Sequence, residues 1–134
     1  MKQQYETALL FLAAVPVAAV ALHAGLVPRF SPVPLWYLLI AAPLWEELFF
    51  RGVIQRRLHE TSRGSRHIAG LSTANWLTSL LFMMAHLPFH GISAAATLAP
   101  SLALGRQFEQ YRHLVPCILL HGWFNLSWLL LARS

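Results

Sequence analysis

Long apolar runs separated by short polar links dominate the pattern of this sequence. Lys, Arg, Asp and Glu are absent from three stretches, Thr7–Pro28, His67–Gly105 and His113–Ala132. Because a helix needs about 20 apolar residues to cross a bilayer, the outer stretches can each hold one span and the middle one can hold two. A further run, Leu35–Ile54, is equally apolar apart from three charged residues. The pattern therefore predicts an all-α, polytopic membrane helix bundle of about five transmembrane helices.

Prolines and turn residues set the expected bounds of these spans. We expect helices over Thr7–Val27, Leu35–Ile54, Thr73–Leu87, Ile92–Gly105 and Leu114–Leu131. The proline-rich segment Val27–Pro34 links the first two, and Pro88–Gly91 is expected to form a hairpin turn. The first run is expected to remain as a span, with a signal peptide cut after Ala21 as the alternative. Residues 1–134 are predicted to form a single domain.

Two prolines lie inside expected spans. Pro43 directly precedes the charged residues of the second span, and Pro100 is expected to interrupt the fourth. A proline in a helix interior removes one backbone hydrogen bond and kinks the helix. The carbonyl that loses its partner must then be satisfied by another group or by water.

Composition and charge favour an integral membrane protein over a soluble or nucleic-acid-binding one. The chain is 57% hydrophobic and 11% charged, with a formal net charge of +5. Its basic residues lie in links between apolar runs, above all in the segment 56–66, which the positive-inside rule places in the cytoplasm. We therefore expect the lipid bilayer, and no nucleic acid, as its partner. The single cysteine, Cys117, excludes an internal disulfide.

Glu46, Glu47 and Arg51 are unusual because they interrupt an apolar span. An ionisable group in hydrocarbon costs at least ~2.5–3.5 kcal/mol, so such groups usually pair or line a polar cavity. On a helix, Glu47 and Arg51 are four residues apart and can pair, and we interpret them mainly as a structural pair. Glu46 points about 100° away around the helix. A carboxylate without a local partner is what a general base in a dry site requires.

Polar groups on two other expected spans complete a possible hydrolytic site. His121 and Asn125 share a helix face, and His86 lies on the third span. A carboxylate can activate water beside one histidine, while a His/Asn pair stabilises the tetrahedral oxygen. A lone His or Asn in a span more often bonds two helices together, so the convergence of Glu46, His86 and His121 is what favours catalysis. The other histidines, including His90, are expected near helix ends or in loops.

The order Glu46-Glu47-x-x-x-Arg51, Phe82-x-x-x-His86 and His121-x-x-x-Asn125 resembles the CAAX prenyl protease and bacteriocin-processing (CPBP, Abi-like) family of intramembrane glutamic endopeptidases. The resemblance covers a motif-bearing core of about residues 35–131. It implies that Glu46 and His86 activate water and that His121 and Asn125 form the oxyanion hole. It also implies that Glu47 and Arg51 support this site, with no cofactor or metal.

The resemblance implies an endopeptidase that cuts a membrane-associated or C-terminal segment of a protein or peptide. Three alternatives remain open. Glu46, His86 and His121 can be a zinc site with an open position for water. Cys117 can be a thiolate nucleophile, although burial disfavours a thiolate. The chain can also be a non-catalytic membrane scaffold or immunity protein. Among membranes, we expect the bacterial inner (plasma) membrane.

Depth in the membrane presents a geometric problem for this site. At 1.5 Å per residue, Glu46 lies about 15 Å from the basic link, whereas His86 lies nearer the far surface if Ser72 begins its helix at the interface. Two solutions are possible. Either the segment 68–75 dips into the bundle, or the third helix is tilted.

Overall fold

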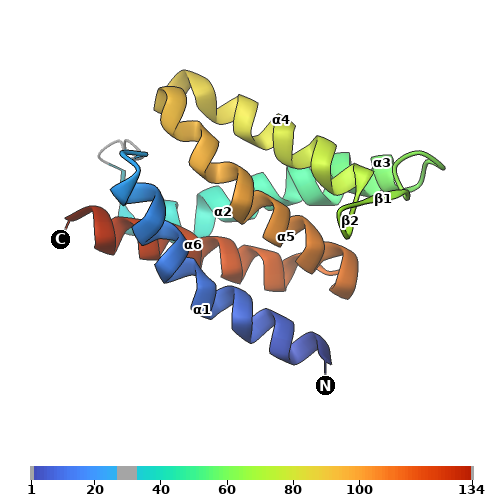
Figure 1. The fold of residues 1–134 in the computed structure, drawn as a ribbon, viewed down its shortest axis with the longest axis horizontal. Helices are drawn as coiled ribbons and strands as arrows, with labels where there is room; N and C mark the ends of the chain where they lie inside the picture. The colour runs from blue at the N-terminus through green and yellow to red at the C-terminus, as the bar shows by residue number, and fades with distance from the viewer. Residues whose placement is uncertain (1, 27–32, 134) are drawn as a thin grey trace.

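The computed structural model describes residues 2–26 and 33–133 and is almost entirely helical (Figure 1). The α-helices are α1 (Lys2–His23), α2 (Ala42–Glu47), α3 (Arg56–His59), α4 (Thr73–His90), α5 (Leu98–Tyr111) and α6 (Leu114–Arg133). Two π-helical segments, η1 (Tyr37–Ala41) and η2 (Leu48–Gln55), flank α2, and a 3₁₀ segment, η3 (Gly91–Thr97), joins α4 to α5. Strands β1 (His67–Ile68) and β2 (Leu71–Ser72) form one small antiparallel hairpin. The predicted all-α membrane bundle is confirmed.

Three helical stretches are long and apolar enough to cross a membrane. They are Tyr5–His23, Thr73–Tyr111 and Leu114–Ala132, and the middle one contains both legs of the α4–α5 hairpin. The helical run of residues 35–59, which carries the charged motif, is not one of the three. Most of the proline-rich link predicted at 27–34 lies outside the described residues.

Helix α6 is the centre of the bundle. It packs against α1, α5, α2 and η1, while α4 and α5 lie side by side as an antiparallel hairpin (Figure 1). Buried Leu104, Phe108, Leu120 and Phe124 join α5 to α6. The outward faces instead expose large apolar side chains, as a surface in contact with lipid does.

The turn between the third and fourth predicted spans lies later in the chain than expected. Helix α4 continues through Pro88 to His90, and the chain turns over Gly91–Thr97 instead of Pro88–Gly91. Gly91 ends α4 with φ +59°, a conformation that favours glycine. The predicted span Ile92–Gly105 is therefore wrong at both ends, because α5 begins at Leu98 and ends at Tyr111. Pro100 does not interrupt α5, since it lies in its first turn, where a missing N–H costs little.

Gly122 allows α6 to approach the backbone of η1 closely. A Cβ at Gly122 would lie 2.5 Å from the carbonyl oxygen of Leu39. Real Cβ atoms do not come this near to backbone oxygen, so any side chain here would push the two helices apart. Small residues at helix crossings are the usual way for membrane helices to pack closely.

We expect Gly122→Ala to destabilise the protein, by about 1–3 kcal/mol if overpacking follows its usual range. The matched control is Gly52→Ala, whose Cβ would lie 3.5 Å from Leu114, an ordinary contact distance. Thermal unfolding in detergent measures both variants. Equal unfolding temperatures for the two would show that the α6–η1 approach is not as tight as described.

Candidate active site

Glu46 and Glu47 end α2, between the two π-helical segments. A π-helical turn places one extra residue in the helix, and such turns often occur at functional sites. The two glutamates themselves lie in the α-helical segment, where adjacent side chains point about 100° apart, so they meet different partners.

Glu46 faces two histidines from two other helices. Its Oε2 atom lies 3.9 Å from Nε2 of His86 on α4 and 3.6 Å from Nε2 of His121 on α6. All three side chains line one cavity of about 470 Å³, which Asn125 also lines. The structure thus brings together the carboxylate and the two imidazoles that the sequence places on separate spans.

The orientation of His86 is fixed by its own helix. Its Nδ1 donates to the carbonyl oxygen of Phe82, 2.8 Å away. Its ring also stacks on the Phe82 ring, with 4.3 Å between the ring centroids. Because the carbonyl only accepts, Nδ1 carries a proton, and Nε2 is the ring nitrogen that faces Glu46.

His121 is oriented by the second glutamate. Its Nδ1 lies 2.8 Å from Oε1 of buried Glu47, and Oε2 of Glu47 accepts from Nε of Arg51 at 3.2 Å. The Glu47–Arg51 pairing is present as predicted. Glu47 also holds a histidine that faces Glu46.

Arg51 is fully buried and each of its nitrogens has an acceptor. Besides Glu47, Nη1 donates to Gln55 at 3.3 Å, and Nη2 donates to the hydroxyl and carbonyl oxygens of Ser101 at 2.6 and 3.1 Å. Gln55 in turn donates to Glu109 at 2.8 Å. These acceptors compensate the removal of the guanidinium from water.

Sequence reasoning missed Gln55, Ser101 and Glu109. The first had a signal, because residues 47, 51 and 55 repeat a polar side chain every four positions along one helix face. Ser101 and Glu109 had no comparable signal. They belong to α5, whose register against residues 35–59 depends on the turn after α4.

The start of α4 and the directions in which side chains lean explain how His86 and Glu46 meet. Ser72 caps α4 by accepting from the N–H of Asn75, and it donates to Glu109, so this end is buried in the bundle. Side chains on a helix lean toward its N-terminus. Because α4 leaves the basic end and residues 35–59 run toward it, His86 and Glu46 lean toward each other.

Asn125 supplies a hydrogen bond that is missing from the helix that carries Glu46. The N–H of Ala42 donates to the carbonyl of Tyr37, five residues back. In this π-helical pattern the next carbonyl, Leu38, requires an N–H from residue 43, which is proline and has none. Nδ2 of Asn125 donates to this carbonyl at 2.9 Å. This is the compensation that Pro43 led us to expect.

A double-mutant cycle tests this tie between the two helices. We expect Asn125→Ala to cost about 1–3 kcal/mol of stability, because it leaves the partly buried carbonyl of Leu38 without a donor. With Pro43→Ala the helix regains an N–H at position 43, so Asn125→Ala should then cost less. Thermal unfolding of the four proteins gives the coupling. An identical cost in both backgrounds would contradict the role of Asn125 as a substitute donor.

Two other residues are placed by the structure. His90 is the last residue of α4, at a helix end as expected, and it also lines the cavity and stacks on His86 with 5.7 Å between ring centroids. Cys117 is fully buried, and its Sγ contacts the carbonyl oxygens of Leu104 and His113 at 3.6 and 3.7 Å. It packs toward α5, outside the set of residues that line the cavity.

The metal-site alternative can be compared with the geometry. Within residues 2–26 and 33–133, no group of three or more His, Cys, Asp or Glu side chains is arranged as a metal site. Yet the Nδ1 atoms of His86 and His121 are both bonded to acceptors while their Nε2 atoms face Glu46. Metal-bound histidines have this orientation, so the alternative requires an experiment.

Comparison with known proteins identifies the family. The profile of the type II CAAX prenyl endopeptidase Rce1-like family matches residues 28–127, which include all the motif residues described above. Comparisons with curated proteins and with solved structures give no match. The match covers most of the chain and agrees with the motif order and the helical membrane architecture. The chain therefore belongs to the type II CAAX prenyl endopeptidase Rce1-like family, a family of membrane peptidases.

Proposed function

We propose that the protein is an intramembrane glutamic endopeptidase that hydrolyses a peptide bond with water activated by Glu46. The observation that carries the proposal is the position of Glu46, which faces Nε2 of His86 and of His121 at 3.9 and 3.6 Å in a cavity among apolar helices. The substrate would be a membrane-associated or C-terminal segment of a protein or peptide. The proposed location is the bacterial inner (plasma) membrane.

In the proposed reaction, water binds between Glu46 and His86. Glu46 removes a proton as the water oxygen attacks the carbonyl carbon of the scissile bond. The carbonyl oxygen becomes an oxyanion while the new C–O bond forms. The C–N bond then breaks, and the proton held by Glu46 passes to the leaving amine. His86 accepts a hydrogen bond from the water, because its own proton is on the Nδ1 side.

His121 and Asn125 are the proposed donors to the oxyanion. Nδ1 of His121 donates to Glu47, so Nε2 can also donate only when the ring is an imidazolium. In that form His121 would place a positive charge between Glu46 and Glu47, of which only Glu47 is paired with Arg51. Asn125 spends one N–H on Leu38 and keeps a second for substrate. Preorganised donors of this kind typically contribute a factor of ~10²–10³ each.

A zinc-dependent peptidase is the second candidate, favoured by the inward-facing Nε2 atoms. In that case Glu46, His86 and His121 would hold the ion, and the metal would activate the water. A non-catalytic scaffold with the same fold is the third candidate. The three candidate functions predict different effects of chelators and of Glu46 substitution on peptide cleavage.

The test begins by finding the substrate. Membrane peptides of cells that carry only the Glu46→Gln protein are compared by mass spectrometry with those of wild-type cells. A species that accumulates uncut is then supplied to the purified enzyme in detergent. We expect wild-type cleavage to continue in phenanthroline, since the proposed step uses no metal. Inhibition that added zinc reverses would assign the site to the metal mechanism.

A further inference from the structure

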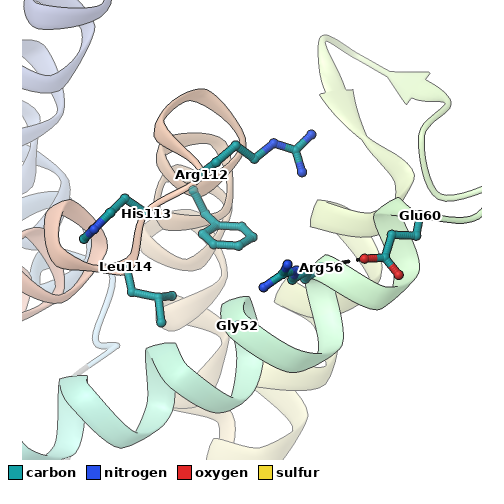
Figure 2. Close-up of a pocket in the computed structure, with 7 residues that line it drawn as sticks. Gly52, Arg56, Glu60, Arg112, His113 and Leu114 are labelled. Atoms are coloured by element: carbon teal, nitrogen blue, oxygen red, sulfur yellow. Dashed lines mark ion pairs between the residues drawn. The ribbon is translucent and has the colours of Figure 1, made fainter.

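A second hollow, of about 500 Å³, lies where α3 meets the link between α5 and α6 (Figure 2). It shares no lining residue with the active-site cavity. Arg56 and Glu60 lie on one side of its opening and Arg112 lies on the other, while His113 is turned away (Figure 2). Phe108 and Leu114 give it an apolar wall.

The two arginines are available to a ligand. Arg56 is exposed and lies 3.9 Å from the carboxylate of Glu60, which is also exposed, so this ion pair is long and in contact with water. The backbone N–H of Arg112 donates to the carbonyl oxygen of Phe108 at 2.8 Å, but within residues 2–26 and 33–133 its guanidinium group has no hydrogen-bond or ion-pair partner. The hollow therefore has two guanidinium groups and only one carboxylate. It lies at the basic end of the bundle, which the positive-inside rule places in the cytoplasm.

The backbone at Arg112 is a second, independent feature. Arg112 follows α5 with φ 53° and ψ 27°, in the left-handed region. Helices usually use glycine at such an end, because side chains are strained there. Arginine therefore has a less favourable backbone conformation at this position than glycine would have. Strained residues of this kind cluster at binding sites.

We propose that this hollow binds a phosphate group, presented by the headgroup of an anionic phospholipid. Guanidinium groups bind phosphate through paired hydrogen bonds, and Arg56 and Arg112 would do so from opposite sides. The glycerol and the first acyl carbons would lie against Phe108 and Leu114. Basic pockets between helices on the cytoplasmic side are suited to such headgroups.

Thermal unfolding of the purified protein in detergent tests the proposal with three additives. These are dioctanoyl phosphatidylglycerol, dioctanoyl phosphatidylcholine and sodium phosphate. We expect phosphatidylglycerol to stabilise the wild type in a saturable way and phosphatidylcholine to have little effect. Equal protection by sodium phosphate would confirm the site and identify free phosphate as the source. Equal protection by both lipids would overturn the proposal.

Substitutions separate a specific site from general attraction to a basic surface. Arg56→Gln and Arg112→Gln should each weaken phosphatidylglycerol binding roughly tenfold, the effect of losing one charge-assisted contact. Arg57→Gln is the matched control, since Arg57 is exposed but does not line the hollow. Glu60→Gln should tighten binding by removing the competing carboxylate.

Two results would overturn the proposal. In the first, Arg57→Gln weakens binding as much as Arg112→Gln, which would show a diffuse electrostatic effect. In the second, a short peptide with a free C-terminal carboxylate protects the wild type while phosphatidylglycerol does not. The hollow would then be part of a surface that binds peptide. All four substitutions are at exposed positions, so the variants are expected to fold.

Discussion

Glu46→Gln is expected to fold normally and to lose nearly all of its cleavage activity. Gln has the size of Glu but cannot accept a proton from water, and loss of a general base typically costs about 10²–10⁴-fold. The Glu46 side chain is 30% exposed and faces a cavity, so the change leaves no buried group without its partner. The variant should therefore retain stability while losing kcat. His86→Ala should have the same effect on activity, because it removes the group that orients the water.

The measurement is the single-turnover rate of the purified proteins on the peptide that accumulates in Glu46→Gln cells. Glu6→Gln is the matched control, since Glu6 is paired with Arg106 away from the cavity. Asn125→Ala should retain a measurable rate, about 10²–10³-fold below wild type, because only one oxyanion donor is lost. If Glu46→Gln cleaves as the wild type does, the glutamic mechanism is wrong. If no peptide accumulates uncut in the Glu46→Gln cells, the result favours the non-catalytic scaffold.

The helical class and the partners of Glu46 could be predicted from the sequence because polar side chains on apolar membrane helices have few positions that avoid lipid. Residues such as Glu46, His86 and His121 must avoid lipid, so they must face one another in the interior. The i, i+4 spacing of Glu47 and Arg51 likewise made their pairing predictable. These inferences need no knowledge of how the helices cross.

The sequence did not predict features that depend on helix register. The turn after α4 was placed at Pro88, because proline usually ends a helix, but a proline in a final turn can be tolerated. Because the turn lies later in the chain than predicted, α5 also begins later than predicted. The contact of Ser101 with Arg51 depends on this register and could not be predicted. The sequence also gave no sign of the π-helical pattern before Pro43. Without that pattern, Leu38 could not be identified as the residue whose carbonyl accepts from Asn125.

Arg51→Leu is expected to have the largest effect on stability. Arg51 and Glu47 are both fully buried, and removing one partner of a buried pair leaves an uncompensated charge that costs roughly 3–5 kcal/mol. The change also leaves Ser101 and Gln55 without the donor that they share. Glu47→Gln should be similarly destabilising. It should also lower kcat in whatever protein folds, because His121 then loses the carboxylate that orients it.

A graded series distinguishes charge from geometry at this position. Arg51→Lys keeps the positive charge but cannot donate to Glu47, Gln55 and Ser101 together, so its stability should lie between wild type and Arg51→Leu. Arg57→Leu removes an exposed arginine six positions along the chain and should unfold close to the wild-type temperature. Protein yield and thermal unfolding in detergent report the order. If Arg51→Leu and Glu47→Gln both accumulate and unfold like wild type but do not cleave, the pair acts in the chemistry and its structural role is wrong.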